Sequence, residues 1–335
     1  MKLFVISSDI TAQLAMDITD FFIKCKTEHE NALILLNSAF SNINRMSQII
    51  DSYQESGVHL TVIGMGNLSV CATALLCTAD ERILLPNTTV SFCYKLANYY
   101  TQKTKLTKRM LQNRCANMAP WYCSKDELVK YNITTKSSEG WMEIIMPTLG
   151  GNETEFVNLF KLTDEFNSET ATKLVLFFVK CKKFHKKDAR IFIHSPGGAG
   201  CQLEAILTAY QDSGIHLTVI GTGLVASCAA ALFCMADERI LTPNTEFMIH
   251  HPHVPLNPKS KKLPYFQALD VSLLLKEKNE FTVEALTKKT NIPRKVLNAK
   301  CKNDADWVLT ENELQKYGVI TRDAKGWMEL LVSTT

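Results

Sequence analysis

The chain has 335 residues, of which 46% are hydrophobic and 21% are charged, and its formal net charge is +3. This length predicts about two domains, each with a core of its own. The mild charge does not favour a protein that binds nucleic acid. Eleven cysteines without a CxxC pair or a tight framework spacing indicate reduced thiols in a reducing compartment rather than a disulfide scaffold.

Two stretches of twenty residues, 60–79 and 217–236, carry no charge and are long enough to cross a bilayer. Each begins with a β-branched run, passes a Gly-x-Gly turn and continues as an Ala- and Cys-rich segment. That order predicts a strand, a tight turn and a buried helix. The N-terminus contains Asp9 and no long apolar core, unlike a signal peptide. We therefore expect a cytoplasmic protein, with an organelle as the alternative, that does not bind a membrane.

The chain repeats itself, and its longest repeated segment is identical at about two-thirds of the aligned positions. Self-similarity on this scale predicts two copies of one domain rather than a short solenoid repeat. We expect a first domain over 1–147, a linker over 148–156 that contains Gly-Gly, and a second domain over 157–335. The matched segments are 52–88 with 209–245, 121–143 with 307–329, and 21–26 with 177–182.

Strand-like and helix-like segments alternate along each copy, which predicts a mostly parallel α/β sheet covered by helices. Four cysteines of the first copy are in register with four of the second. Matched positions predict packing inside each copy rather than cross-links. The pairs are Cys25 with Cys181, Cys71 with Cys228, Cys77 with Cys234, and Cys115 with Cys301.

Three short motifs of the second copy contain residues suited to catalysis, although each also has an ordinary structural reading. The "HSPGG" motif at 194–198 predicts a plain turn, or exposed N–H groups that bind an oxyanion. Ser227 stands where a strand becomes a helix, as a helix N-cap or as a nucleophile. His250 in "MIHHPHV" ends a strand, as a surface residue or as a general base. The nearby His251 and His253 do not favour a metal site, because a proline interrupts them and no carboxylate cluster is near.

The order of these three motifs resembles the ClpP family, the proteolytic subunits of the Clp protease, which are self-compartmentalising serine peptidases. The resemblance covers essentially the whole second copy and implies two tandem ClpP/crotonase-like spiral domains built from ββα repeats, with no cofactor. It also implies a role for specific residues. These are a Ser227–His250–Asp306 triad with Asp304 as the alternative acid, an oxyanion hole of the Gly198 and Cys228 backbone N–H groups, and a substrate-binding strand at Pro196, Gly197 and Gly198.

The first copy lacks every one of these features. Val70, Cys93 and Pro120 stand at the positions of the triad, and Ala39, Phe40 and Ser41 replace Pro-Gly-Gly. We interpret this copy as a pseudoenzyme domain, because Cys93 has no partner histidine in register. His250 to Cys301 spans 51 residues and Cys93 to Cys115 spans 22, so the first copy is 29 residues shorter there. In the ClpP family this segment is the handle that joins two rings, and its loss predicts a different assembly.

The resemblance implies a serine endopeptidase of the ATP-dependent type that acts in protein quality control through an acyl-enzyme at Ser227. Its expected partners are peptides or unfolded proteins, an AAA+ unfoldase, and further copies of itself or other Clp-type subunits. A catalytically inactive assembly or binding subunit is the first alternative. A crotonase-like acyl-CoA enzyme is the second, because that group shares the spiral fold and a glycine-rich oxyanion hole.

Overall fold

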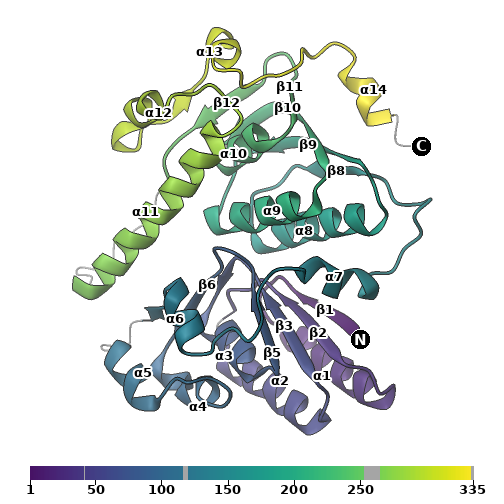
Figure 1. Cartoon of the computed structure of the whole chain (residues 1–335), viewed down its shortest axis with the longest axis vertical. Coiled ribbons are helices and arrows are strands. Elements are labelled where there is room, and N and C mark those ends of the chain that lie inside the picture. Colours follow the sequence, from purple (N-terminus) through teal and green to yellow (C-terminus); the bar gives the residue numbers. More distant parts are fainter. Residues whose placement is uncertain (41, 116–119, 253–264, 333–335) are drawn as a thin grey trace. The chain divides into compact units, whose positions relative to one another are not determined.

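The computed structural model describes residues 1–40, 42–115, 120–252 and 265–332, and the side chains among them except at 265–274, 304 and 332. The chain divides into two compact units, Met1–Gly150 and Gly151–Thr335 (Figure 1). The division falls inside the segment that the sequence predicts as a linker. The two units are described separately below.

A parallel sheet of the order β1-β2-β3-β5 forms the centre of the first unit. Its inner strands, such as β2 with the sequence ALILL, are apolar throughout, as expected for parallel strands that are covered on both faces. Helix α1 starts at a cap from Thr11 and helix α2 at a cap from Asn42, each accepting a hydrogen bond from a backbone N–H of the first turn. The elements are β1 Lys2–Ile6, α1 Ala12–Thr27, β2 Ala32–Leu36, α2 Ile43–Ser56, β3 Leu60–Gly64 and β5 Glu81–Leu84.

A second, three-stranded sheet of the order β4-β6-β7 completes the first unit. Its strands are β4 Asn67–Leu68, β6 Thr89–Phe92 and β7 Trp121–Tyr122, and helix α3 (Val70–Thr78) follows β4. Short helices make up the remainder. These are η1 Tyr94–Leu96, α4 Ala97–Tyr100, α5 Lys108–Arg114, α6 Lys125–Lys130, α7 Trp141–Ile145 and η3 Met146–Thr148.

The second unit contains one sheet of the order β13-β12-β10-β9-β8, with β11 also paired to β10. Strand β10 (His216–Ala226) is irregular between Gly221 and Val225, and its first half pairs with β11 while its second half pairs with β12. Helices α8 and α9 lie side by side on this sheet (Figure 1). The strands are β8 Leu159–Leu162, β9 Asp188–Ser195, β11 Glu238–Leu241, β12 Glu246–Ile249 and β13 Trp307–Val308. The helices are α8 Ser168–Lys183, α9 Gly200–Ser213, α10 Cys228–Met235, α11 Tyr265–Thr287, α12 Arg294–Lys300, η4 Lys302–Asp304, α13 Glu311–Lys316 and α14 Trp327–Val332.

The sequence predictions for the elements are confirmed in both units. Each has a mostly parallel sheet, and each uncharged stretch forms a strand followed by a short buried helix, α3 or α10. Within the described part of the chain, no helix combines the length and the apolar character needed to cross a membrane. All four register-matched cysteine pairs are buried in the hydrophobic cores, as their positions predict.

Candidate active site

Ser227 occupies a sharp turn between β10 and α10. Its φ of 56° and ψ of −121° lie in a region that residues with a side chain rarely adopt. The turn is fixed from behind, because the Ser227 N–H donates to the Met248 carbonyl at 2.9 Å. The Ser227 side chain caps no N–H of α10, so the ordinary reading as a helix cap is wrong. A strained turn of this kind exposes a hydroxyl where a strand meets a helix.

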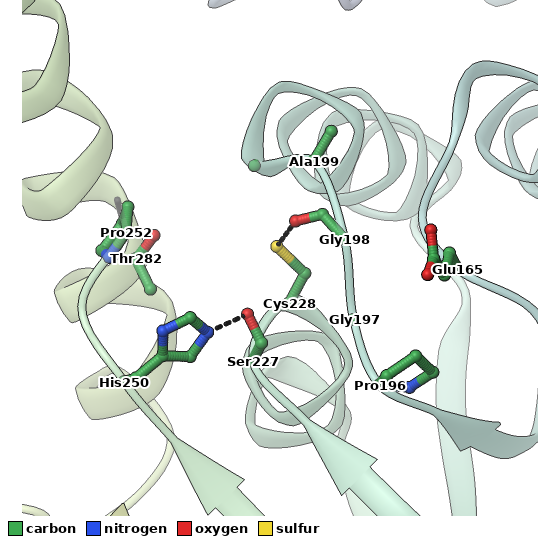
Figure 2. Close-up of a pocket in the computed structure, with 11 residues that line it drawn as sticks. Glu165, Pro196, Gly197, Gly198, Ala199, Ser227, Cys228, His250, Pro252 and Thr282 are labelled. Carbon is green, nitrogen blue, oxygen red and sulfur yellow. Dashed lines mark hydrogen bonds between the residues drawn. The ribbon is translucent and has the colours of Figure 1, made fainter. Parts of the chain in front are cut away.

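His250 follows β12 and reaches this hydroxyl. Its Nε2 atom lies 2.6 Å from Ser227 Oγ (Figure 2). The His250 ring is only half-buried, so it is able to exchange a proton with a bound molecule. A nucleophile and a base within hydrogen-bonding distance are what nucleophilic catalysis requires. The structure therefore brings together two of the three side chains that the resemblance selects.

The third predicted side chain, Asp306, directly precedes a strand that pairs with β12. Strands β12 and β13 are antiparallel, with Met248 opposite Val308 and Ile249 opposite Trp307. The ladder ends at this second pair, and His250 and Asp306 are the residues that adjoin its end. Asp306 is exposed, and among the described residues no hydrogen bond joins its carboxylate to His250. The side chain of Asp304, the alternative acid, lies outside the described residues.

The glycine segment has one edge paired and the other facing Cys228. The Gly197 carbonyl accepts from the Phe166 N–H at 2.7 Å, and the Ala199 N–H donates to the Phe166 carbonyl at 3.0 Å. Because these groups alternate along an extended chain, the Gly198 N–H and C=O point to the opposite edge. There the Cys228 thiol donates to the Gly198 carbonyl at 3.1 Å. Burial raises the pKa of this thiol to about 12, so it stays protonated and able to donate.

A cleft of about 450 Å³ surrounds Ser227 and His250. Pro196, Gly197 and Gly198, which the sequence predicts as a substrate-binding strand, are among the residues that line it. Glu165 and Thr282 also line it and were not singled out from the sequence, because no motif marks them. Thr282 lies on α11, more than fifty residues after Ser227 in the sequence, and it reaches the cleft because the chain brings α11 back to this place. Ala199, Gly200, Cys228 and Pro252 complete the lining (Figure 2).

The matching place in the first unit is filled. Val70 is the first residue of α3 and has no positive φ, so no sharp turn forms there. The register of β6 and β7, with Phe92 opposite Trp121, continues to Cys93 opposite Pro120. Tyr100 is fully buried and lies between Val70 and Cys93. Its hydroxyl donates to the Val70 carbonyl at 2.9 Å and accepts from the Cys93 N–H at 3.4 Å.

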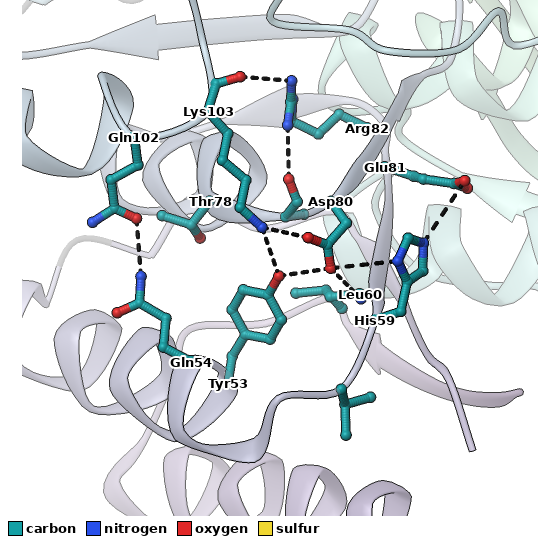
Figure 3. A network of polar contacts seen from close by, with 12 residues as sticks. Tyr53, Gln54, His59, Leu60, Thr78, Asp80, Glu81, Arg82, Gln102 and Lys103 are labelled. Atoms are coloured by element: carbon teal, nitrogen blue, oxygen red, sulfur yellow. Dashed lines mark hydrogen bonds and ion pairs between the residues drawn. The ribbon is translucent and has the colours of Figure 1, made fainter. Parts of the chain in front are cut away.

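A polar network of the first unit recurs in the second. Asp80 accepts from the Tyr53 hydroxyl and from the Leu60 N–H, both at 2.8 Å, and pairs with Lys103 (Figure 3). Burial disfavours the charged carboxylate, but the bonds from Lys103, Leu60 and Tyr53 outweigh it and lower the pKa of Asp80. The second unit repeats these contacts with Asp237, Tyr210, Leu217 and Lys289 at 2.5–2.8 Å.

This correspondence locates the difference in length between the two units. Lys103 and Lys289 each pair with the aspartate of their network. Lys103 comes 10 residues after Cys93, whereas Lys289 comes 39 residues after His250. The difference of 29 residues therefore lies before Lys103. In that interval the first unit has only η1 and α4, whereas the second has the long helix α11.

A serine on a strained turn, an imidazole at its hydroxyl and backbone N–H groups beside it have the chemistry of a serine hydrolase, namely acyl transfer. The model of the Clp protease family matches residues 157–323. An ATP-dependent Clp protease proteolytic subunit 3 of Rhizobium etli is 30% identical over 51% of this chain and 88% of its own length. A proteolytic subunit 1 of Shouchella clausii is 28% identical over 48% of this chain and 79% of its own. The chain belongs to the Clp protease family.

Gly197 is expected to tolerate no side chain. A Cβ atom there would lie 2.7 Å from the Ala226 carbonyl oxygen and from Ser227 Cβ, at a φ of 92°. We expect Gly197→Ala to displace the turn at Ser227 and to slow labelling of that serine by a fluorophosphonate about 100-fold. Gly200→Ala is the matched control, because it lies in the same cleft with no atom within 4 Å of its added methyl group. Equal labelling of both variants would contradict this assignment.

Proposed function

We propose that the second unit is a serine endopeptidase and that Ser227 is its nucleophile. The observation that carries the proposal is the 2.6 Å contact between Ser227 Oγ and His250 Nε2 at a residue held in a strained conformation. A serine that served only the helix would accept a hydrogen bond from the first turn. The membership of the chain in the Clp protease family supports a peptide substrate.

In the proposed reaction, His250 takes the hydroxyl proton as Ser227 attacks the carbonyl carbon of a peptide bond. The tetrahedral oxyanion accepts hydrogen bonds from the N–H groups of Gly198 and Cys228. His250 then passes the proton to the leaving amine, and water releases the acyl group from Ser227 by the same steps. We assign to Asp306, with Asp304 as the alternative, the role of orienting the imidazole and stabilising its cationic form.

An extended peptide fits the cleft as an added strand along Pro196, Gly197 and Gly198. The paired edge of this segment is occupied by Phe166, so the substrate would use the edge that faces Cys228. Main-chain recognition of this kind gives a broad tolerance for substrate sequence. Peptides and unfolded proteins are accordingly the proposed substrates, and the reaction needs no cofactor.

We also propose that the two units are tandem copies and that the first, over 1–147, is a pseudoenzyme domain joined by a linker at 148–156 to a peptidase domain over 157–335. Two observations support this. The polar network of Asp80 recurs at Asp237, and Tyr100 lies between the positions proposed to match the nucleophile and the base. The structural role that remains to the first copy is to contribute to assembly or to the handling of substrate.

The relatives are named proteolytic subunits of an ATP-dependent protease. We propose from this an AAA+ unfoldase as a partner, association with further copies or with other Clp-type subunits, and a cytoplasmic location. The short connection between Cys93 and Lys103 leaves the first copy without a handle. Any assembly of this chain would therefore lack half of the handles that an assembly of complete copies has.

Labelling with a fluorophosphonate distinguishes the proposed function from its two alternatives. We expect the purified chain to gain one phosphonyl group, and peptide mapping by mass spectrometry to place it on Ser227. A folded protein that stays unlabelled would favour the inactive assembly subunit. Binding of a coenzyme A thioester, without labelling, would favour the crotonase-like enzyme.

A further inference from the structure

A largely buried ion pair joins α9 and α11, two helices that each contribute a residue to the lining of the cleft. Lys278 on α11 pairs with Glu204 on α9, and their side chains are only 15% and 3% exposed. Another ion pair of α11 is different in kind, because Glu280 pairs with Arg294 of α12 while both side chains are 53% exposed. Exposed pairs contribute little, whereas a charge left alone in a buried site is costly.

Each partner of the buried pair stands one helical turn from a wall of the cleft. Glu204 lies four residues after Gly200, where the glycine segment that lines the cleft enters α9. Lys278 lies four residues before Thr282, the α11 residue that lines the opposite side. Residues four apart on a helix share one face, so the pair links the two helices one turn away from Gly200 and from Thr282.

In the first copy, no ion pair is formed at the position that corresponds to Glu204. Ser47 stands at the position of Glu204 and bonds to the Tyr99 hydroxyl at 2.7 Å, in a unit that lacks the long helix. The charged pair is thus present in the copy with an open cleft and absent from the copy whose cleft is filled. Because the first unit lacks α11, the pair accompanies the long helix and the open cleft rather than the elements that the two units share.

We propose that Glu204 and Lys278 are positioning residues that set the width of the cleft for an extended peptide. The inference rests on the proposed peptidase function. The pair touches neither Ser227 nor His250 among the contacts of the described residues, so it acts through the walls of the cleft. Its loss should impair the binding of a chain several residues long and leave the reactivity of Ser227 toward a small reagent intact.

Two probes of different length test this proposal. One is a small alkyl fluorophosphonate, and the other is a peptidyl phosphonate that carries four residues on its acyl side. For Glu204→Gln and for Lys278→Met we expect the second-order rate of Ser227 labelling by the peptidyl probe to fall 10- to 30-fold. The rate with the small probe should stay within twofold of the unchanged chain. The charge-swapped double variant, with Glu204→Lys and Lys278→Glu, should regain most of the peptidyl rate.

Glu280→Gln is the matched control, since it removes an exposed ion pair from the same helix and should change neither rate. Thermal unfolding of each variant separates a fold defect, which slows both probes, from a change in the cleft. Unchanged peptidyl labelling in folded single variants, or no recovery in a folded double variant, would overturn the positioning role alone. Failure of both probes to label the unchanged chain would overturn the peptidase itself.

Discussion

Replacing Ser227 by alanine is expected to lower peptide hydrolysis by about 10⁴-fold or more. The change removes the Ser227 hydroxyl that contacts His250 Nε2 and leaves the rest of the cleft in place. The substitution should leave the fold intact, because the Ser227 side chain caps no backbone group of α10. Initial rates on a fluorogenic peptide, together with an unchanged unfolding temperature, measure the effect.

The first unit provides the control for this variant. Cys93→Ala changes a residue of that unit, beside the buried Tyr100 hydroxyl. Because this unit contains neither Ser227 nor His250, we expect hydrolysis to stay within twofold of the unchanged chain. Activity that survives Ser227→Ala, or that is lost with Cys93→Ala in a folded protein, would show that the nucleophile lies elsewhere.

Arg82→Met is expected to destabilise the first unit by about 3–5 kcal/mol. Arg82 is 2% exposed, and its guanidinium donates to four backbone carbonyls at 2.7–3.1 Å. Methionine fills a similar volume but leaves these acceptors without a donor in a buried place. The carbonyls belong to Ala79, Lys103, Asn132 and Ile133, so the loss would loosen several loops at once. Denaturant unfolding followed by circular dichroism measures the change.

Two further variants frame this result. Arg239→Met removes the equivalent group of the second unit, whose donors reach four carbonyls at 2.8–3.0 Å, and should cost a similar amount. Arg114→Met removes a half-exposed arginine that pairs with Glu127 and should cost less than about 1 kcal/mol. Similar losses for Arg82→Met and Arg114→Met would refute the role of the buried network.

Much of the fold was predictable because its strands and helices are marked by continuous local patterns. The runs before Gly64 and Gly221 predict buried strands, and the Ala- and Cys-rich segments after them predict the helices α3 and α10. The contact between Ser227 and His250 was implied only by the resemblance to the ClpP family, because each residue on its own also fits an ordinary structural role. The backbone conformation of Ser227 was not predictable, since it depends on how β10 meets β12.

Features that depend on contacts between residues far apart in the chain could not be predicted from the sequence. Thr282 and Lys278 lie on α11. The sequence pattern of this segment predicts a helix, but it does not predict which face of the helix contacts α9. Nothing in the local sequence of Tyr100 predicts that its hydroxyl will bond to both Val70 and Cys93. The choice between Asp306 and Asp304 is of the same kind, because two acids two residues apart fit one motif and only their side-chain positions separate them.

The buried Tyr100 bears on any attempt to build an active site into the first unit. Its hydroxyl bonds to the Val70 carbonyl and to the Cys93 N–H, so a serine at 70 and a histidine at 93 would be introduced on either side of its ring. Val70 also has no positive φ, so a serine there would lack the backbone conformation of Ser227. Side-chain exchanges at these positions alone should therefore not produce a serine hydrolase, because the backbone and the packing around Tyr100 would stay as they are.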